Sequence, residues 1–322
     1  MLWGVRVATD ARVGGGHLAR CSALSQALNT RAMLFTDPDY KGGRGSEWAS
    51  MAVAEASMAS AGCAIAALRS GDIDVLIVDS YAIGDDVIRE AAANGAVAVF
   101  RDGTPYGAET ITIDPNPGRA DSKSVLGGPS YMPLPAEFVQ RNLQGRAHKM
   151  PNRPLSVLVA FGARDSANRT IMALEGSEGL GGRLTVSVAL GSGAPNAESV
   201  LARLRNMPFA GILDDRAALA DRYNSFDVAI GAPGVSQFER ACCGLASLLV
   251  PQNEKQIRLA DAWQQTGAAV CSAPDSGAVA KQLTMLLDKP DRIEDMRRCG
   301  LSLVDGQGAA RLAGALKQRL AA

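Results

Sequence analysis

Residues 3–28 read WGVRVATDARVGGGHLARCSALSQAL, and this stretch predicts a strand, a glycine-rich turn and a helix. Val5–Thr9 is short and mostly apolar, which is typical of a strand in a parallel sheet that is covered on both faces. The glycines at 14–16 allow the backbone to turn sharply and to approach a ligand closely. Apolar residues then recur with helical spacing over Leu18–Leu28. The chain therefore opens with a strand followed by a helix.

The same alternation of strands and helices continues along the chain. Further strands are expected in the first half at Ala32–Thr36, Val75–Asp79, Ala96–Phe100 and Thr110–Asp114, with helices at Ser46–Ala61 and Asp85–Ala93. Those of the second half are expected at Leu155–Phe161, Leu184–Leu190, Phe209–Leu213, Val228–Gly231, Ser247–Val250 and Ala268–Cys271, with helices at Ala278–Leu287 and Ala309–Leu320. This pattern predicts an α/β protein with two doubly wound, Rossmann-like domains that face a cleft.

A polar stretch with two prolines, Asn142–Pro154, interrupts the periodicity before a strong strand begins. Domain boundaries often fall in such segments. A chain of 322 residues is long enough for two domains. We therefore place the boundary between residues 148 and 149, which gives domains of residues 1–148 and 149–322.

Composition and charge exclude several classes of partner. Lys+Arg and Asp+Glu are both 33, and this balance argues against a nucleic-acid partner that is held by bulk positive charge. No apolar run is long enough to span a membrane, so no membrane association is expected. The N-terminus lacks the pattern of a signal peptide. Six cysteines without a Cys-x-x-Cys pair, and only two histidines, argue against a metal site and fit a reduced, cytoplasmic location. The oligomeric state is left open.

His17 is the first candidate for chemistry, because it stands where the glycine turn meets the helix. A neutral imidazole can take a proton from water. Asp10 lies close in the chain and could orient His17 or bind a sugar hydroxyl, or it could only cap the loop. The stretch also mimics a dinucleotide fingerprint, with Asp37 after the next strand, but residues 10–13 separate the strand from its first glycine, which argues against that interpretation.

A second candidate site follows the strand Val228–Gly231, where the sequence reads APGVSQFER over residues 232–240. Gly234 and the amides near Val235 and Ser236 could cradle a diphosphate at the start of a helix. Glu239, one turn into that helix, could accept hydrogen bonds from both hydroxyls of a ribose, which would be worth roughly 1.5–3 kcal/mol each. A capping box from Ser236 to Glu239 satisfies the same spacing.

Other strand ends carry polar residues that either a ligand site or ordinary turn chemistry would explain. They are found in Val78–Tyr81, in Phe161–Asp165 and in Pro251–Gln256, the last of which includes Asn253 and Gln256.

Taken in order, these residues carry a resemblance that covers about the whole chain. The motifs are Asp10…Gly14-x-Gly16-His17-x-x-Arg20, Val78-Asp79-Ser80-Tyr81, Gly128-Pro129-x-Tyr131, Phe161-Gly162-x-x-Asp165-x-x-Asn168-x-Thr170, Gly231-Ala232-x-Gly234-x-x-x-x-Glu239-Arg240 and Asn253-x-x-Gln256. The series resembles the UDP-2,4-diacetamido-2,4,6-trideoxy-β-L-altropyranose hydrolases of bacterial pseudaminic acid biosynthesis. These are similar in fold to GT-B glycosyltransferases, especially the UDP-GlcNAc transferase that makes lipid II.

The resemblance implies a metal-independent hydrolase without a cofactor, which acts on a UDP-sugar and water. Water would attack the anomeric carbon with inversion, and UDP would leave. His17 would be the base, with Asp10 beside it. The N-terminal domain would hold the sugar, and the C-terminal domain would bind UDP through Glu239 at the ribose and Gly234, Val235 and Ser236 at the diphosphate. The remaining expected substrate-binding residues are Gly14, Gly16, Arg20, Asp79, Tyr81, Gly162, Asn168, Asn253 and Gln256.

The chain departs from the family pattern at several positions, and these affect the expected sugar more than the nucleotide. They are Ala8, Arg101-Asp102, Leu134-Pro135, Ala163-Arg164, Pro233 and Ser236. Two alternatives therefore stay open: a GT-B glycosyltransferase that uses the same donor site with an alcohol in place of water, and a non-catalytic protein that binds a UDP-sugar.

Overall fold

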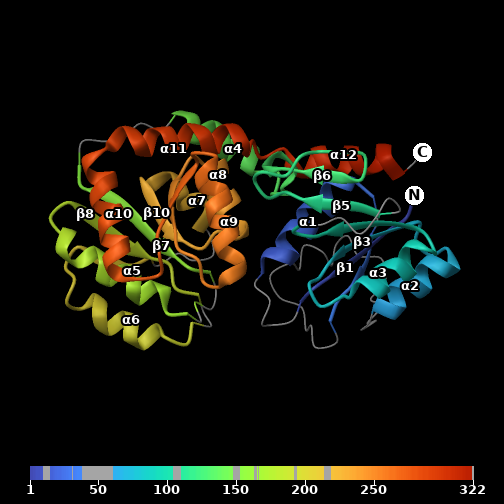
Figure 1. Cartoon of the computed structure of the whole chain (residues 1–322), viewed down its shortest axis with the longest axis horizontal. Helices are drawn as coiled ribbons and strands as arrows, with labels where there is room; N and C mark the ends of the chain where they lie inside the picture. The colour runs from blue at the N-terminus through green and yellow to red at the C-terminus, as the bar shows by residue number, and fades with distance from the viewer. Residues whose placement is uncertain are drawn as a thin grey trace. The chain divides into compact units, whose positions relative to one another are not determined.

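The chain folds into two compact units (Figure 1). The computed structural model describes residues 1–9, 15–30, 32–37, 61–103, 110–147, 153–162, 165, 167–191, 194–213 and 219–320. Unit 1 consists of Met1–Ala136 and Gly306–Ala322, and unit 2 consists of Glu137–Asp305. Within the described ranges, no helix has the length and apolar character that crossing a membrane requires.

Unit 1 is built on a six-stranded parallel sheet with the strand order β2-β1-β3-β4-β5-β6. Its strands are β1 Trp3–Val7, β2 Ala32–Phe35, β3 Val75–Asp79, β4 Ala96–Phe100, β5 Thr110–Asp114 and β6 Val125–Gly127. Its helices are α1 Gly16–Leu28, α2 Ala61–Ser70, α3 Asp85–Ala92, the short 3-10 helix η2 Pro129–Tyr131 and α12 Gly308–Leu320.

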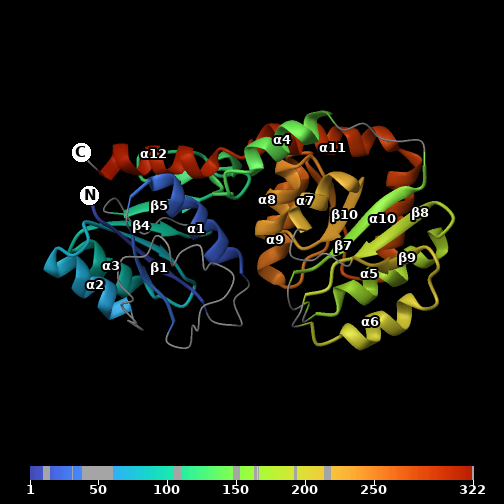
Figure 2. The ribbon, with the colours of Figure 1, turned by 180° about the vertical axis from the view of Figure 1, so that it is seen from behind.

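Helices cover both faces of this sheet, which explains why its strands are apolar on both sides. Trp3 and Val5 of β1 pack with Leu24 of α1 and with Leu312 and Leu316 of α12 in one core cluster. A second cluster joins the other face of the sheet to α2 and α3. Figures 1 and 2 show α1 and α12 together on one face, with α2 and α3 on the opposite face. The C-terminal helix therefore completes the core of the N-terminal sheet.

Unit 2 repeats the architecture with the strand order β12-β11-β10-β7-β8-β9, again all parallel. Its strands are β7 Leu155–Ala160, β8 Leu184–Val188, β9 Ala210–Ile212, β10 Val228–Gly231, β11 Ala246–Leu249 and β12 Ala269–Cys271. Its helices are α4 Phe138–Ala147, α5 Arg169–Ser177, η3 Glu178–Leu180, α6 Ala197–Leu204, α7 Leu219–Arg222, η4 Tyr223–Ser225, α8 Val235–Cys242, α9 Glu254–Gln265, α10 Ser276–Asp288 and α11 Pro290–Leu303.

Each sheet reverses its winding direction next to its first strand. In unit 1 the reversal lies between β1 and β3, and in unit 2 it lies between β7 and β10. In open α/β sheets, ligands bind beyond the carboxyl ends of the strands at this switch point. The segments to examine for function are therefore those that follow β1, β3, β7 and β10.

The predicted fold class, two doubly wound α/β domains, is confirmed, whereas the predicted cleft between them stays a prediction. The sequence pattern missed the short strand β6. The helix expected at Ser46–Ala61 falls mainly outside the described residues, and α2 begins at Ala61.

The polar stretch Asn142–Pro154 does not begin as a linker, because α4 runs through Ala147 and belongs to unit 2. Buried Asn142 donates hydrogen bonds to the carbonyl oxygens of Cys242 (3.1 Å) and Val304 (3.0 Å). Its polarity therefore serves contacts within unit 2 instead of exposure to solvent. The compact units also differ from the single boundary placed at 148/149, since unit 1 takes up the chain again at Gly306.

Two glycines of α12 provide a matched test of its packing in unit 1. A Cβ at Gly308 would lie 2.0 Å from the carbonyl oxygen of Met132, whereas a Cβ at Gly314 would meet nothing within 4 Å. We expect Gly308→Ala to destabilise the fold by about 1–3 kcal/mol through overpacking. Gly314→Ala should stabilise it by about 0.5–1 kcal/mol, because alanine is the better helix former. Thermal unfolding midpoints that shift the same way in both variants would contradict this placement of α12.

Candidate active site

His17 lies in the first turn of α1, and its imidazole meets the carboxylate of Asp79 at the end of β3. The distance from His17 Nδ1 to Asp79 Oδ1 is 2.5 Å, and the two side chains are 12% and 1% exposed. A carboxylate can only accept, so Nδ1 carries the proton in this contact. In a neutral imidazole, Nε2 is then the atom with the free lone pair.

Arg20, one helical turn further, grips the same carboxylate with a fork of two hydrogen bonds. Its Nε donates to Asp79 Oδ2 (2.6 Å) and its Nη2 donates to Oδ1 (2.5 Å). The guanidinium also lies over the Phe100 ring, 4.6 Å from its centroid. Nη2 comes within 3.2 Å of His17 Nδ1 because both groups donate to the same oxygen.

The electrostatics of this cluster keep Asp79 ionised. Burial favours a higher pKa for Asp79, but the charge and hydrogen bonds of Arg20, with a smaller contribution from His17, lower that pKa to about 2. The thiol of Cys21 donates a further hydrogen bond to Oδ2 (3.3 Å). At neutral pH a negative charge therefore stands behind the His17 imidazole.

The structure thus joins three predicted residues by hydrogen bonds, His17, Arg20 and Asp79. Asp79 was expected to bind substrate, but it is fully buried with both oxygens occupied, so we assign it the orienting role first considered for Asp10. Asp10 and Gly14 lie outside the described residues. Gly16 is the first residue of α1, and Gly15 is its N-cap without a side-chain hydrogen bond.

The end of the segment that follows β1 in the described residues is held by a separate contact. Arg6 of β1 pairs with Asp37 after β2, and Asp37 Oδ2 also accepts the backbone N–H of Thr9 (2.6 Å). Asp37 is therefore engaged within the protein, where a dinucleotide fingerprint would need an acidic residue for a ribose. This agrees with the argument against dinucleotide binding.

Tyr81, just beyond β3, approaches His17 from a second side. Its ring meets the imidazole edge-on, with ring centroids 5.1 Å apart and planes at 86°. Its hydroxyl donates to Asp102 Oδ2 (2.9 Å). Tyr81 is 60% exposed.

In unit 2, the turn after β10 leads directly into α8. Gly234 is the N-cap, and no side chain caps the helix. The predicted capping box from Ser236 is therefore not formed, since Ser236 is already the second helical residue. No hydrogen bond to the amides of Val235 and Ser236 is found among the described residues, so this helix end suits an anion.

Arg240 braces this turn from inside the protein. It is buried, and its Nη2 donates to the carbonyl oxygen of Ala232 (2.8 Å) while its Nε donates to Gln237 Oε1 (3.2 Å). Both partners are neutral. Arg240 was expected only as part of a motif. Its contact with Ala232 could not be predicted, because it depends on how the turn folds back over α8.

Glu239 lies one turn into α8, half-buried beside Tyr223. The Tyr223 hydroxyl donates to Glu239 Oε2 (3.0 Å). Burial raises the pKa of Glu239, although Tyr223 and Arg240 act in the opposite direction. No partner of Oε1 is found within the described part of the chain, so this oxygen could accept from a ligand.

The other predicted residues of unit 2 have clear roles in local structure. Asn253 caps α9 by accepting the N–H of Gln256 (3.1 Å), and Gln256 Oε1 accepts the N–H of Gln252 (2.9 Å). Gly162 and Asn168 both have positive φ angles, 83° and 53°, and shape the segment after β7.

Asp165, between Gly162 and Asn168, is the buried residue that holds this segment. It accepts the N–H groups of Arg169 (2.8 Å) and Thr170 (2.9 Å) at the start of α5. The motif contained Asp165, but its capping role was not predicted.

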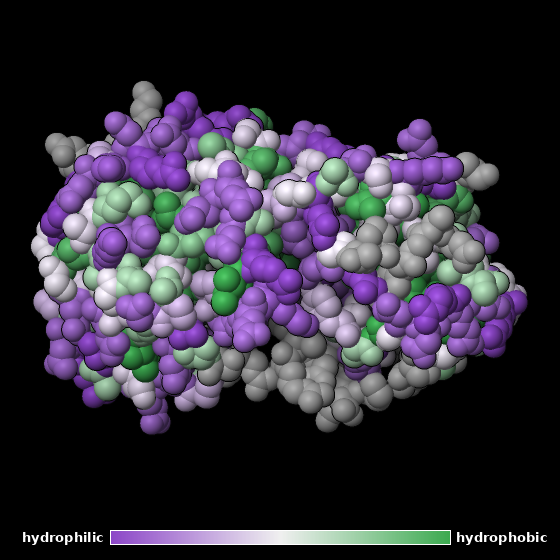
Figure 3. All heavy atoms as spheres, in the orientation of Figure 1, coloured by the Kyte–Doolittle hydropathy of each residue, from purple (hydrophilic) through white to green (hydrophobic). Residues whose placement is uncertain are grey.

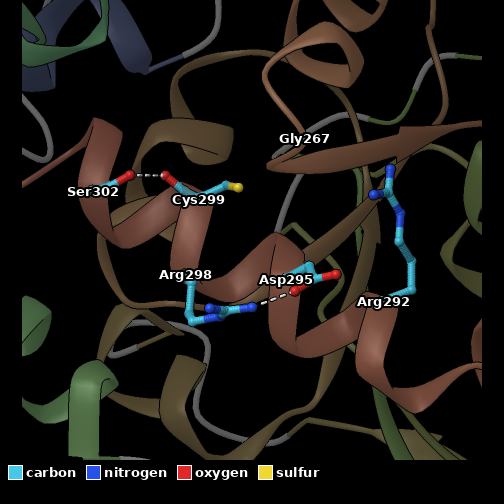
Figure 4. Close-up of a pocket in the computed structure, with 6 residues that line it drawn as sticks. All are labelled: Gly267, Arg292, Asp295, Arg298, Cys299 and Ser302. Atoms are coloured by element: carbon cyan, nitrogen blue, oxygen red, sulfur yellow. Dashed lines mark hydrogen bonds and ion pairs between the residues drawn. The ribbon is translucent and has the colours of Figure 1, made fainter.

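Figure 4 shows a hollow of unit 2 beside α11. It is lined by Gly267, Arg292, Asp295, Arg298, Cys299 and Ser302, and Arg298 there pairs with Asp295. It contains none of the predicted site residues, so the candidate site is defined by side-chain geometry and not by this hollow.

The two doubly wound units are those of the GT-B fold, and comparison with known proteins supports this class. No family model matches the chain. It is 22% identical to the spore coat polysaccharide biosynthesis protein SpsG of Bacillus subtilis strain 168, covering 94% of each chain.

Solved structures agree in fold at low sequence identity. MurG of Acinetobacter baumannii superposes with a TM-score of 0.72 at 13% identity, covering 98% of this chain and 99% of that one. UDP-GlcNAc 2-epimerase of Neisseria meningitidis, solved with bound UDP-GlcNAc, gives a TM-score of 0.63 at 10% identity, with 99% and 100% covered.

The lowered pKa of Asp79 predicts how stability depends on pH. The ionised carboxylate stabilises the fold above its unfolded pKa of 3.8, and this contribution of about 2 kcal/mol is lost as the pH falls from about 4 to about 2. Asp79→Asn should destabilise the protein by about 3–5 kcal/mol at neutral pH, because Arg20 is left buried without its carboxylate.

The difference in unfolding free energy between the parent and Asp79→Asn should therefore narrow at acid pH. Urea unfolding at a series of pH values measures it, and Asp86→Asn, at an exposed position of α3, is the control. A difference that stays constant down to about pH 2 would contradict the ionised state of Asp79.

Proposed function

We propose that this chain hydrolyses a UDP-linked amino-deoxy sugar to UDP and the free sugar. The resemblance in sequence favours UDP-2,4-diacetamido-2,4,6-trideoxy-β-L-altropyranose as the substrate. The broader part of the proposal is a UDP-sugar-utilising enzyme of the GT-B class. It is supported by the relative in polysaccharide biosynthesis and by the epimerase of the same fold that was solved with UDP-GlcNAc.

The observation that carries the proposal is the hydrogen bond of His17 Nδ1 to the ionised, buried carboxylate of Asp79 at the switch point of unit 1. A histidine held in this way presents a basic Nε2. The same arrangement of a carboxylate behind an imidazole serves general-base catalysis in unrelated enzymes.

In the proposed reaction, Nε2 of His17 takes a proton from a water molecule as its oxygen attacks the anomeric carbon. The bond from that carbon to the β-phosphate oxygen breaks, and UDP leaves with the bonding electrons. Attack opposite the leaving group inverts the anomeric configuration. Asp79 stabilises the imidazolium, and a base positioned in this way contributes roughly a hundred- to ten-thousand-fold.

Unit 2 is assigned to the nucleotide. The uncapped amides at Val235 and Ser236 would hold the diphosphate and its growing negative charge, and Arg240 would keep the turn in shape. Glu239, which Tyr223 orients through one oxygen, would accept the ribose hydroxyls with the other.

A GT-B glycosyltransferase is the second candidate, because a solved protein of the same fold, from Rickettsia africae, is a glycosyltransferase. It would use the same base and donor site with an alcohol acceptor. The exposed large apolar side chains of the described residues are Met1, Leu2, Tyr81, Val139, Leu143, Leu201 and Ile257. On the face in Figure 3, apolar atoms lie dispersed among polar ones.

The reaction is tested by incubating the purified protein with a panel of UDP-sugars in ¹⁸O-labelled water, without an acceptor. We expect one sugar-nucleotide to release UDP, with the label in the sugar. His17→Ala should lower kcat by about a hundredfold or more while UDP still binds. Label in UDP would mean attack at phosphorus, and UDP release only with an added alcohol would favour the transferase. Binding without any turnover would indicate a non-catalytic protein.

The role of Glu239 is tested with two nucleotides that differ only in the ribose hydroxyls. Glu239→Ala should weaken UDP binding by about ten- to a hundredfold, because hydrogen bonds to a charged group are lost. The affinity for 2′,3′-dideoxy-UDP should already be weak in the parent and should change little in the variant. Calorimetry measures both, and an equal loss for the two nucleotides would remove Glu239 from the ribose.

A further inference from the structure

We propose that Asp102, just after β4, is a positioning residue that fixes the orientation of the His17 imidazole through the Tyr81 ring. The inference rests on the proposed role of His17 as the base. It goes beyond the sequence motifs, because Asp102 stands where the chain departs from the family pattern, and no function was expected for it.

The His17 ring has a second constraint besides Asp79. The hydrogen bond at Nδ1 limits the torsion that turns the plane of the imidazole, within the angular range that a hydrogen bond tolerates. The direction of Nε2 depends on that torsion, so a further contact on the ring narrows it. The Tyr81 ring, edge-on at 5.1 Å, is a contact that restrains the plane.

Tyr81 is held by a hydrogen bond as well as by packing. The residue is 60% exposed in a turn, so packing covers less than half of its surface. An edge-to-face aromatic contact is worth only about 0.5–1.5 kcal/mol. The charge-assisted hydrogen bond from the Tyr81 hydroxyl to Asp102 Oδ2 (2.9 Å) adds a fixed point for the ring.

Asp102 is in turn tied to the buried end of β5. Its Oδ1 accepts from Asn116 Nδ2 (2.6 Å), and the same amide nitrogen donates to Asp114 Oδ1 (2.8 Å). Asp114 is 1% exposed and is held by Arg119 (2.6 Å) and by the N–H of Gly103 (3.0 Å). A continuous set of hydrogen bonds therefore connects a rigid part of the sheet to the ring beside His17.

The test uses the fact that the chain has only two histidines, so that His148 can serve as the reference signal in NMR spectra of histidine-labelled protein. The edge-on tyrosine ring shifts the carbon-bound ring protons of His17. In Asp102→Ala the Tyr81 ring should sample several positions. The chemical shifts of the His17 protons should therefore move toward the average over those positions. Tyr81→Phe, which keeps the ring and removes the hydroxyl, should move them in the same direction.

The double variant separates positioning from a general effect on the loop. If Asp102 acts through the Tyr81 hydroxyl, adding Asp102→Ala to Tyr81→Phe should cause no further change in the chemical shifts of the His17 ring protons. Asp86→Ala, at an exposed position of α3, should leave the His17 signals unchanged. Unchanged signals in Asp102→Ala, or a full additional shift in the double variant, would overturn the proposal.

Turnover gives a second, separate readout. Asp102→Ala and Tyr81→Phe should each lower kcat about tenfold with KM nearly constant, since a misdirected base affects the chemical step more than binding. An unchanged kcat would also overturn the proposal. If the variants give the expected NMR response but the protein turns over no UDP-sugar, the result contradicts the proposed hydrolysis. The positioning role of Asp102 would still stand.

Discussion

The candidate site depends on one buried negative charge, the carboxylate of Asp79 at the end of a central strand. Removing a carboxylate from water is costly unless hydrogen bonds and an opposite charge replace the solvent. Arg20 supplies both, and this leaves one direction from which His17 can approach as a donor. The interaction thus joins α1 to β3, fixes the protonated nitrogen of the imidazole and keeps a negative charge behind it.

Much of the fold could be predicted because strand ends and helix periods are local properties of the sequence. The apolar runs at Val75–Asp79 and Val228–Gly231 were found with the bounds that the structure has. Glycine-rich turns after strands also identified His17 and Gly234 as candidates. Among the elements that local patterns missed are β6, α11 and α4, and α4 has polar residues that are buried within unit 2.

The partners within the site could not be predicted, because they depend on strand order. His17 and Asp79 are 62 residues apart, and they meet because β1 lies beside β3 in the sheet. No spacing in the sequence reveals that neighbourhood, so Asp10 was the nearer choice for the orienting acid. The same applies to Asp102 and Tyr81, which follow β4 and β3. Competing local patterns account for Ser236, where a capping box fitted the spacing but the helix had already begun at Val235.

The return of the chain to unit 1 at Gly306 has a consequence for biosynthesis. The first core cluster of unit 1 includes Leu312, Ala313 and Leu316, so the part of the sheet face that α12 covers beside α1 stays exposed until α12 has been translated. Unit 2 is continuous in sequence and can complete its core earlier. Although domains generally fold from the N-terminus onward during synthesis, here the second unit can mature before the first. Newborn unit 1 would expose this apolar surface throughout that interval.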